Sequence, residues 1–397
     1  MNYNKQRLPE RQETAAPVRG SFDIPFFALT LLLLTIGVIM VLSASFPRAY
    51  YQGKSPMYYF LRQGLFAAAG VCFMIVFSKI NMAVYRRFSF WVLAVSVLLL
   101  MVVPIIGTSG GGAKRWISLG FTTFQPSEIA KIGVVLFFAN MICNYKNEMK
   151  TFKHGVLPFA VITVAIVGLL MLEPHLSASI IICAIAIVML FVGGVKLSYF
   201  VSGIAASGVL VFIAVKFIPY VQARITAWQD PFADKSGDGY QVVQSLLSIG
   251  SGGFLGLGLG QSRQKYLYLP EEHNDYIFSI VCEELGFVGA AAILILFALL
   301  ICRGYWIAMH SPDRYSFLVC VGIMTLLSIQ VFLNIAVVTN LIPCTGISLP
   351  FFSYGGTALL IQMGEAGILL SISRENPCAA YAPRQLFQTV KNQKIEE

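Results

Sequence analysis

Apolar stretches of membrane-spanning length recur along the chain and dominate its pattern. They start near Ile24, Tyr58, Phe88, Ser127, Leu157, Leu176, Leu197, Asn274, Tyr315 and Ser348. Each approaches the roughly 20 apolar residues that a helix needs to cross a bilayer. We therefore predict an all-α polytopic membrane protein with ten transmembrane helices between residues 23 and 373. The polar segments 1–22 and 374–397 are predicted to be solvated tails.

The composition supports a membrane protein over a soluble one. Hydrophobic residues make up 57% of the 397 residues and charged residues 12%, which is more apolar surface than one soluble core uses. The first apolar stretch ends without a small-residue cleavage site and is followed by further spans. We predict that it is an anchor and not a removed signal peptide.

The distribution of basic residues predicts the orientation of the spans. If the N-terminus is inside, most of the 28 Lys and Arg residues fall in cytoplasmic loops and tails, as short cytoplasmic loops require. Both termini are therefore predicted to lie inside. The net charge of +9 is explained by this asymmetry and by attraction to anionic lipid headgroups. The sequence contains no nucleic-acid-binding module, and we predict no nucleic-acid partner.

The cysteines and histidines indicate neither a disulfide framework nor a zinc site. Most of the eight cysteines lie in or beside apolar spans, and only Cys344 falls in an outer loop. No pair has metal-ligand spacing, and the four histidines are scattered. The cysteines are interpreted as small hydrophobic residues.

Two predicted outer loops are long, Gly107 to Pro126 and Tyr220 to His273, the latter between the seventh and eighth spans. A long loop in a compact protein is usually functional or disordered, and the aromatics, glycines and charges of both loops favour function. The second loop contains the glycine-rich segment 250–260. A nucleotide-binding fingerprint would need a strand, a helix and a cytoplasmic location. We instead predict an interfacial or re-entrant segment.

Several charged residues fall in or at the edges of predicted spans: Arg62, Lys131, Glu283, Glu284 and Glu365. A charge near the bilayer centre costs roughly 2.5–3.5 kcal/mol on insertion scales, so these side chains should face the bundle interior. Glu128 lies one turn before Lys131 and can pair with it. Glu128 also follows Pro126, where a carboxylate complements the helix dipole. The spacing leaves a functional and a helix-end role open.

An acidic block from Glu271 to Tyr276 precedes the eighth span. Asp275, Ser279, Cys282 and Gly286 share one face of a helix that is predicted to begin near Asn274. Asp275 would head this small, polar face and point inward, although a helix-end charge is the alternative. His273 and two further acids lie within one turn. A partly desolvated carboxylate with like charges nearby has a raised pKa and can serve as a base.

Three ordered motifs resemble the SEDS proteins (shape, elongation, division and sporulation), a family typified by FtsW and RodA. The first runs from Gly112 to Ile117 and continues through Gln125-Pro126-Ser127-Glu128 to Lys131; the second runs from Leu269 to Gly286; the third runs from Asn334 through Leu349-Pro350 to Ser353-Tyr354-Gly355-Gly356. With ten spans and both ends inside, the resemblance covers nearly the whole chain. Segment 240–265 is most similar to the FtsW and SpoVE branch, which favours division over elongation.

The resemblance implies a peptidoglycan glycosyltransferase of the bacterial cytoplasmic membrane. SEDS proteins join lipid-linked disaccharide units, lipid II, into glycan strands on the outer face of the membrane, with a class B penicillin-binding protein as crosslinking partner. Other divisome membrane proteins and the division septum are further expectations. The essential Asp of the family's large loop corresponds to Asp275. The Trp and Glu of its earlier loop correspond to Trp116 and Glu128.

The chemistry of glycan growth agrees with this assignment. The 4-hydroxyl of one sugar attacks the anomeric carbon of another that is held on a lipid diphosphate, so a site needs a base and cations. Asp275 is the predicted base. The predicted cations for the diphosphate are Lys114, Arg115, Lys131 and Arg62.

Other predicted contributors surround these groups. Trp116 could stack on a sugar or anchor its loop at the interface. Glu271, Glu272 and His273 are predicted to adjust the pKa of Asp275, and His273 is also a predicted substrate-binding residue. No organic cofactor is predicted, and the sequence leaves open whether a divalent cation, Mg²⁺ or Mn²⁺, assists the diphosphate.

Some positions depart from the family pattern. Asn274 and Tyr276 replace the usual Thr and Phe beside the essential Asp, and Glu173-Pro174-His175 stands where the family often has Gln-Pro-Asp. No role of that Asp is transferred. The Ser353–Gly356 turn is interpreted as structural. Two other functions stay open: a lipid II flippase and a noncatalytic scaffold that recruits the penicillin-binding protein.

Overall fold

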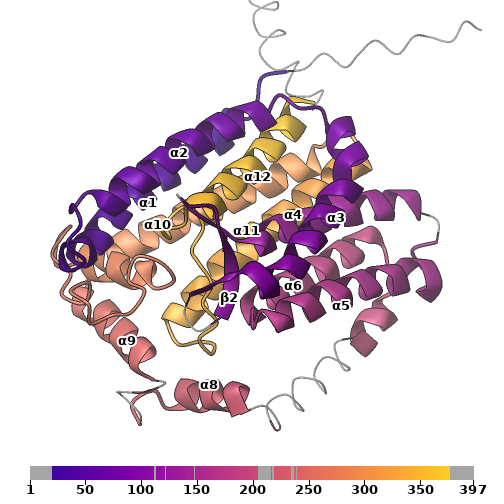
Figure 1. The fold of residues 1–397 in the computed structure, drawn as a ribbon. Helices are drawn as coiled ribbons and strands as arrows, with labels where there is room; N and C mark the ends of the chain where they lie inside the picture. The colour runs from indigo at the N-terminus through magenta and orange to yellow at the C-terminus, as the bar shows by residue number, and fades with distance from the viewer. Residues whose placement is uncertain are drawn as a thin grey trace, which may run out of the picture.

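The computed structural model describes residues 20–110, 113–120, 122–146, 148–203, 216, 219–233, 237 and 239–375. The helices are α1 (Ile24–Tyr51), α2 (Tyr58–Phe77), α3 (Met82–Ile106), α4 (Pro126–Asn144), η1 (Phe152–Val156), α5 (Leu157–Leu172), α6 (Leu176–Gly193), α8 (Pro219–Gln229), α9 (Tyr240–Gly252), α10 (Ile277–Met309), α11 (Arg314–Val338) and α12 (Gly356–Arg374). Figure 1 shows them as one helical assembly.

Membrane-length helices dominate the described chain. Nine of them are long and apolar enough to span a bilayer: α1 to α4, η1 with α5, α6, and α10 to α12. The predicted fold class, an all-α polytopic membrane protein, is confirmed. The seventh predicted span, starting near Leu197, falls largely on residues 204–215, outside the described residues. The third span begins at Met82 and the last at Gly356, so both predicted starts, near Phe88 and Ser348, were misplaced.

Side-chain caps explain where several spans begin. The carboxylate of Asp23 accepts a hydrogen bond from the backbone N–H of Phe26 at the start of α1, and Asp313 does the same for Ser316 in α11. Asn81 caps α3 through its Oδ1, which explains why this helix begins before Phe88. These acceptors satisfy backbone N–H groups that a helix leaves unpaired in its first turn.

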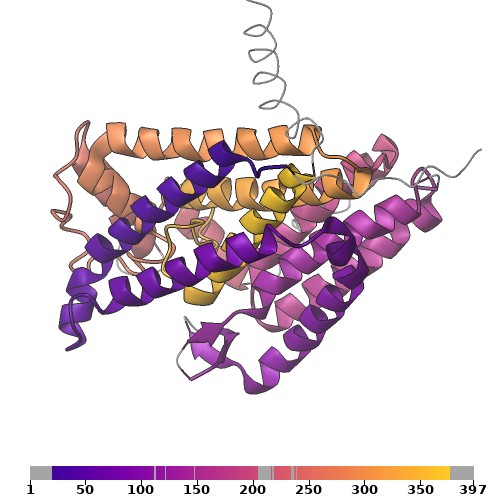
Figure 2. The same ribbon diagram turned by 90° about the horizontal axis from the view of Figure 1, so that it is seen from above.

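The most buried spans form the centre of the bundle. Buried residues make up 72% of the apolar window in α4, α11 and α12, against 22% in α2 and in η1 with α5. Helix α12 packs against α2, and α4 packs against α3, α6 and α11. Figures 1 and 2 both show α12 beside α2. Outer helices expose large apolar side chains, including Leu65 and Val164, as lipid contact requires.

Both ends of the described chain meet at one end of the bundle. The backbone N–H of Gly20 donates to the carbonyl of Arg374 at 2.9 Å, and that of Asp23 donates to Ser373 Oγ at 3.0 Å. At the other end of α1, Arg48 pairs with Glu272 ahead of α10. This arrangement agrees with the prediction that both termini lie on one side.

The long loops predicted from the sequence contain regular structure. Residues 107–126 include the strands β1 (Thr108–Gly110), β2 (Ala113–Ser118) and β3 (Thr123–Phe124), which form an antiparallel sheet in the order β1-β2-β3. The segment from Tyr220 to His273 includes most of α8 and all of α9, and α9 packs against α10. The sheet was not predicted, because strands this short carry little periodic signal.

We predict that Asp23→Ala destabilises the protein more than Asp23→Asn. Asp23 both caps α1 and forms a two-point ion pair with Arg303 of α10. Asn keeps a capping acceptor and Ala does not, a difference of about 1 kcal/mol. Thermal unfolding in detergent should rank wild type above Asp23→Asn and Asp23→Ala lowest. Equal midpoints for the two variants would contradict the capping role.

Candidate active site

A cavity of about 830 Å³ opens at the end of the bundle opposite the chain termini. Its wall combines α2, β2, α4, the start of α6, the turn before α10, and the segment that leads into α12. Six predicted site residues line it: Arg62, Arg115, Trp116, Glu128, Lys131 and Asp275. These six come from α2 and from the first two sequence motifs, and Leu349, Ser353 and Tyr354 of the third motif also line the cavity.

Asp275 lies in the turn ahead of α10, because the helix begins only at Ile277. The prediction that Asp275 shares a helical face with Ser279, Cys282 and Gly286 is therefore wrong for Asp275. Farther along the helix, Ser279 Oγ lies 2.8 Å from Ser245 Oγ of α9, so that face points toward α9. Asp275 instead lines the cavity.

The third sequence motif holds the backbone around Asp275. The side-chain amide of Asn334 donates to the Asp275 carbonyl at 2.8 Å, and Ser353 Oγ donates to the Asn274 carbonyl at 2.8 Å. The backbone N–H of Tyr354 donates to the carbonyl of His273 at 2.9 Å. Three consecutive carbonyls are therefore bound by residues more than fifty positions away, which gives the C-terminal motif a structural role.

The surroundings of Asp275 favour a carboxyl that titrates near neutrality. Burial raises its pKa and so does the negative charge of Glu271, while Arg115 opposes both; the net result is a pKa of about 6. An unperturbed Asp titrates near 3.9. A carboxylate with this pKa can accept a proton from a hydroxyl more readily than an ordinary Asp.

The α4 wall of the cavity carries a buried ion pair. Lys131 Nζ lies 2.7 Å from Glu128 Oε2, and the Lys131 side chain is 3% exposed. The predicted pairing is therefore present. Both residues belong to α4, where the one-turn separation brings their side chains together. Glu128 thus has a specific partner beyond the helix dipole.

Further cations occupy the rim of the cavity. Arg115, on β2, donates to the backbone carbonyls of Glu173 and Pro174. Arg62, on α2, donates to Tyr58 Oη at 2.8 Å. Lys114 is exposed and does not line the cavity, so the prediction that it contributes to the cationic wall finds no support in this geometry.

Two of the predicted tuning residues face elsewhere. Glu272 is fully buried and accepts two hydrogen bonds from the Arg48 guanidinium at 2.7 Å each. The ring of His273 packs against those of Tyr59 and Tyr354, with centroid distances of 5.0 and 5.7 Å. Neither residue lines the cavity. Of the three predicted tuning residues, Glu271 is the one that lines the cavity with Asp275.

Sequence reasoning missed several residues that line the cavity. Lys54 lies 4.5 Å from the ring centroid of Tyr58 and adds a cation beside Arg62. Gln330 is a polar side chain in the buried apolar helix α11, and such a residue marks an interior path in a membrane protein. His175 faces Gln125, with 3.3 Å between Nε2 atoms. For Gln330, the isolated polar side chain in the apolar run was the available signal.

Within the described residues, no group of three or more His, Cys, Asp or Glu side chains is arranged to hold a metal ion. The free cysteines in that part of the chain include Cys282, Cys320 and Cys344. Glu271 and Asp275 are the carboxylates on the acidic side of the cavity. On the α4 wall, the carboxylate of Glu128 is paired with Lys131.

Fold and cavity together define a polytopic membrane protein with a polar, charged chamber at one membrane end. The family model described as "Cell cycle protein" (FtsW, RodA, SpoVE) matches residues 24–377, and the chain belongs to this family. The family and fold class expected from the sequence are thereby confirmed.

Relatives and solved structures agree with this membership. The chain is 40% identical to stage V sporulation protein E of Bacillus subtilis over 359 residues, covering 90% of this chain and 98% of the relative. It is 38% identical to a probable peptidoglycan glycosyltransferase FtsW of Trichlorobacter lovleyi over 357 residues, covering 89% and 93%.

Two solved structures share the fold over most of their length. One comes from work described as "Structural coordination of polymerization and crosslinking by a peptidoglycan synthase complex", with a TM-score of 0.74, 28% identity and coverage of 89% and 98%. The other is the rod shape determining protein RodA of Thermus thermophilus, with a TM-score of 0.67, 25% identity and coverage of 90% and 98%.

We predict that Gly346→Ala impairs the site beyond its effect on folding. Gly346 has φ +67°, and an added Cβ would lie 3.2 Å from Asp275 Oδ2. The backbone strain costs roughly 1–2 kcal/mol. Gly53→Ala is the matched control, because Gly53 has the same φ and open space around its Cβ position. Both variants should lose stability, but only Gly346→Ala should also lose polymerising activity; similar activity in the two would contradict the contact with Asp275.

Proposed function

We propose that this protein is a peptidoglycan glycosyltransferase that polymerises lipid II into glycan strands, with Asp275 as the general base. The enzyme class predicted from the sequence agrees with the names of the relatives. The observation that carries the residue assignment is the placement of Asp275 in a charged cavity with cations on separate walls. A base and an anion-binding wall are the two elements that this transfer needs.

The reaction can be followed atom by atom. The Asp275 carboxylate takes the proton of a sugar 4-hydroxyl as that oxygen attacks the anomeric carbon of a second sugar. The bond from the anomeric carbon to the diphosphate oxygen breaks, and its electron pair leaves with the diphosphate. Arg62 and Arg115 line the cavity and can stabilise the charge that develops there, because a guanidinium can bind phosphate oxygens in a bidentate way.

Trp116 and the ion pair on α4 complete the proposed roles. Trp116 presents an apolar ring on the cavity wall that can stack on a sugar. Lys131 is already paired with Glu128, so it offers less free charge to the diphosphate than an unpaired lysine would. We assign this pair to shaping the wall and the local field.

A divalent cation fits the proposal as a companion of the substrate. Mg²⁺ is commonly held by one or two carboxylates together with substrate phosphates. Glu271 lines the cavity beside Asp275 and could hold such a cation, which would neutralise charge on the leaving diphosphate. Any requirement for Mg²⁺ or Mn²⁺ stays a prediction.

The proposed location follows from the position of the cavity. The described chain ends meet at the opposite end of the bundle, and basic loops predict that this end is cytoplasmic. The cavity would then face outward, where the lipid-linked sugars are joined. A class B penicillin-binding protein as partner, other divisome proteins, and action at the septum are parts of the same proposal.

We predict that Asp275→Asn abolishes polymerisation. The amide keeps the size of the side chain and cannot accept the proton, and loss of a general base typically costs 10²- to 10⁴-fold. The measurement is glycan formation from lipid II by the purified protein with its partner. Asp313→Asn is the control, since it removes a carboxylate at the other end of the bundle and keeps the capping acceptor.

The outcomes separate the three functions. Equal glycan yield from Asp275→Asn and wild type would overturn the catalytic assignment. Movement of lipid II across vesicles without glycan would favour a flippase. Stimulation of the partner's crosslinking by both proteins, without glycan from either, would favour a scaffold.

We predict that polymerisation rises with pH through a midpoint near 6. Below this pH Asp275 is protonated and cannot act as a base; above it the carboxylate is available. Glu271→Gln removes a charge that raises the Asp275 pKa, so its midpoint should fall. Arg115→Met removes a charge that lowers this pKa, so its midpoint should rise. Rates measured from pH 4.5 to 8 test both directions, and shifts of the opposite sign would contradict the assignment.

A further inference from the structure

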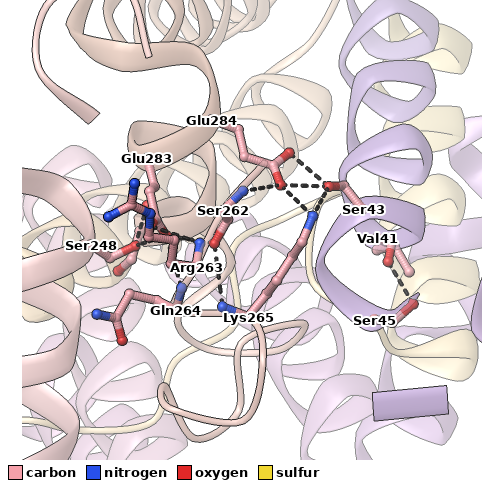
Figure 3. A network of polar contacts seen from close by, with 11 residues as sticks. Val41, Ser43, Ser45, Ser248, Ser262, Arg263, Gln264, Lys265, Glu283 and Glu284 are labelled. Carbon is pink, nitrogen blue, oxygen red and sulfur yellow. Dashed lines mark hydrogen bonds and ion pairs between the residues drawn. The ribbon is translucent and has the colours of Figure 1, made fainter. Parts of the chain in front are cut away.

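Two adjacent carboxylates of α10 lie outside the cavity in a polar network of their own. Glu283 and Glu284 have side chains that are almost completely buried, at 0% and 1% exposure, and neither lines the cavity. Figure 3 shows them among Ser248, the segment 262–265 and Ser43 of α1. Their place is costly, because an ion loses hydration when it is buried.

Glu284 is bound from two directions. Lys265 Nζ lies 2.8 Å from its Oε1, and Ser43 Oγ of α1 donates to the same carboxylate at 2.7 Å. Lys265 Nζ also donates to Ser43 Oγ at 3.2 Å, and its side chain is 3% exposed. A buried lysine, glutamate and serine thus satisfy one another, as Figure 3 shows.

Glu283 binds the same chain segment through hydroxyl and backbone donors. Ser262 Oγ and Ser248 Oγ both donate to its Oε2. The backbone N–H of Arg263 donates to its Oε1 at 2.9 Å. The two carboxylates of α10 therefore bind the segment 262–265 together. We name these contacts, Glu283 and Glu284 with Ser262, Arg263 and Lys265, the carboxylate clasp.

The carboxylate clasp closes the base of the loop that carries Asp275. In the sequence, Asp275 lies midway between Lys265 and Glu284. The contacts between 262–265 and 283–284 therefore hold together the two ends of the segment 265–284, which has Asp275 at its middle. The tip is held separately by Asn334 and Ser353. Closing the base removes conformational freedom that the tip contacts would otherwise have to restrain.

Backbone hydrogen bonds also hold the glycine-rich segment against α10 at the base of this loop. α10 is interrupted at Gly286, with φ 66° and ψ −169°, which leaves carbonyls without helical partners. The N–H groups of Leu257 and Gly258 donate to the carbonyls of Glu283 and Glu284 at 2.9 and 3.0 Å. A Cβ at Gly256 would lie 2.2 Å from the Glu284 carbonyl oxygen. The glycine-rich segment is thus bound along the helix interruption.

A buried ion pair is a poor source of stability compared with apolar residues of the same volume. It is directional, however, because the carboxylate and ammonium groups must meet at hydrogen-bond distance. The Lys265–Glu284 pair therefore fixes the register of the loop base more strictly than apolar packing would. A fixed register at the loop base matters here because the Asp275 carboxylate, farther along the loop, must meet a substrate hydroxyl.

We propose that Lys265 and Glu284 are positioning residues for Asp275, acting through the carboxylate clasp at the base of its loop. The inference rests on the proposed role of Asp275 as the base. No residue of the clasp lines the cavity, so its loss should displace Asp275 while leaving substrate-binding groups on the other walls in place. A displacement of about 1 Å at a reacting group can cost about 100-fold in rate.

The test compares Lys265→Met, Lys265→Arg and Glu284→Gln in the full-length protein with its partner. Lys265→Met removes the charge and keeps the length of the side chain. We expect its kcat for lipid II polymerisation to fall about 10- to 100-fold with KM within about twofold. Lys265→Arg should recover much of kcat. Amide exchange in 266–276 should accelerate in Lys265→Met and Glu284→Gln but not in Lys265→Arg.

Arg303→Met is the matched control. Arg303 of α10 pairs with Asp23, the N-cap residue of α1, at 2.7 Å, so this ion pair holds the same helix, α10, at the other end of the bundle. It should lower the unfolding midpoint and leave kcat unchanged. An equal loss of kcat in Arg303→Met and Lys265→Met would overturn the proposal, because general destabilisation would then explain both.

Four other outcomes are decisive. A folded Lys265→Met with kcat within twofold of wild type overturns the positioning role. Failure of all three clasp variants to fold, with Arg303→Met folded, assigns the clasp to folding and also overturns it. Asp275→Asn is run alongside: if it retains activity, the proposed function fails, whereas an inactive Asp275→Asn with unaffected clasp variants rejects the clasp alone.

Discussion

The hydrogen bond from the Asn334 side chain to the backbone carbonyl of Asp275 is the contact on which the geometry of the site depends. Asn334 also donates to the carbonyl of Ile347, so one side-chain amide joins the acidic turn to the segment that leads into α12. That segment brings Gly346 against the Asp275 carboxylate. The third motif therefore supports the backbone of the second motif around Asp275.

The buried carboxylates near this site differ in whether a basic side chain is paired with them. Glu128, Glu272 and Glu284 are each paired with a basic side chain within 2.8 Å. In the part of the chain that the structure describes, the Asp275 carboxylate has no such ion pair. A paired carboxylate is held in its charged form, whereas a desolvated one has a raised pKa. Asp275 thus differs from these three carboxylates in lacking a basic partner among the described residues.

The sequence allowed the spans and the principal residues to be predicted for identifiable physical reasons. Membrane burial makes apolar length a strong signal, and the Glu128–Lys131 pair follows from helical spacing alone. The partners of Glu272 and Glu284 could not be predicted, because Arg48 and Ser43 lie more than two hundred residues away in the sequence. Asp275 was expected on a helix because the apolar run gives no sign that α10 starts at Ile277.

In the proposed reaction, the base and the leaving diphosphate need opposite electrostatic surroundings. The cavity provides both because they lie on different walls. A base gains proton affinity from burial and from the nearby negative Glu271, whereas Arg115 reduces it. The leaving diphosphate needs cations such as Arg62 and Arg115. If these cations lay directly on Asp275, they would lower its pKa and weaken the base. Placing them on β2 and α2, apart from the acidic turn ahead of α10, allows one cavity to hold both a competent base and an anion-binding wall.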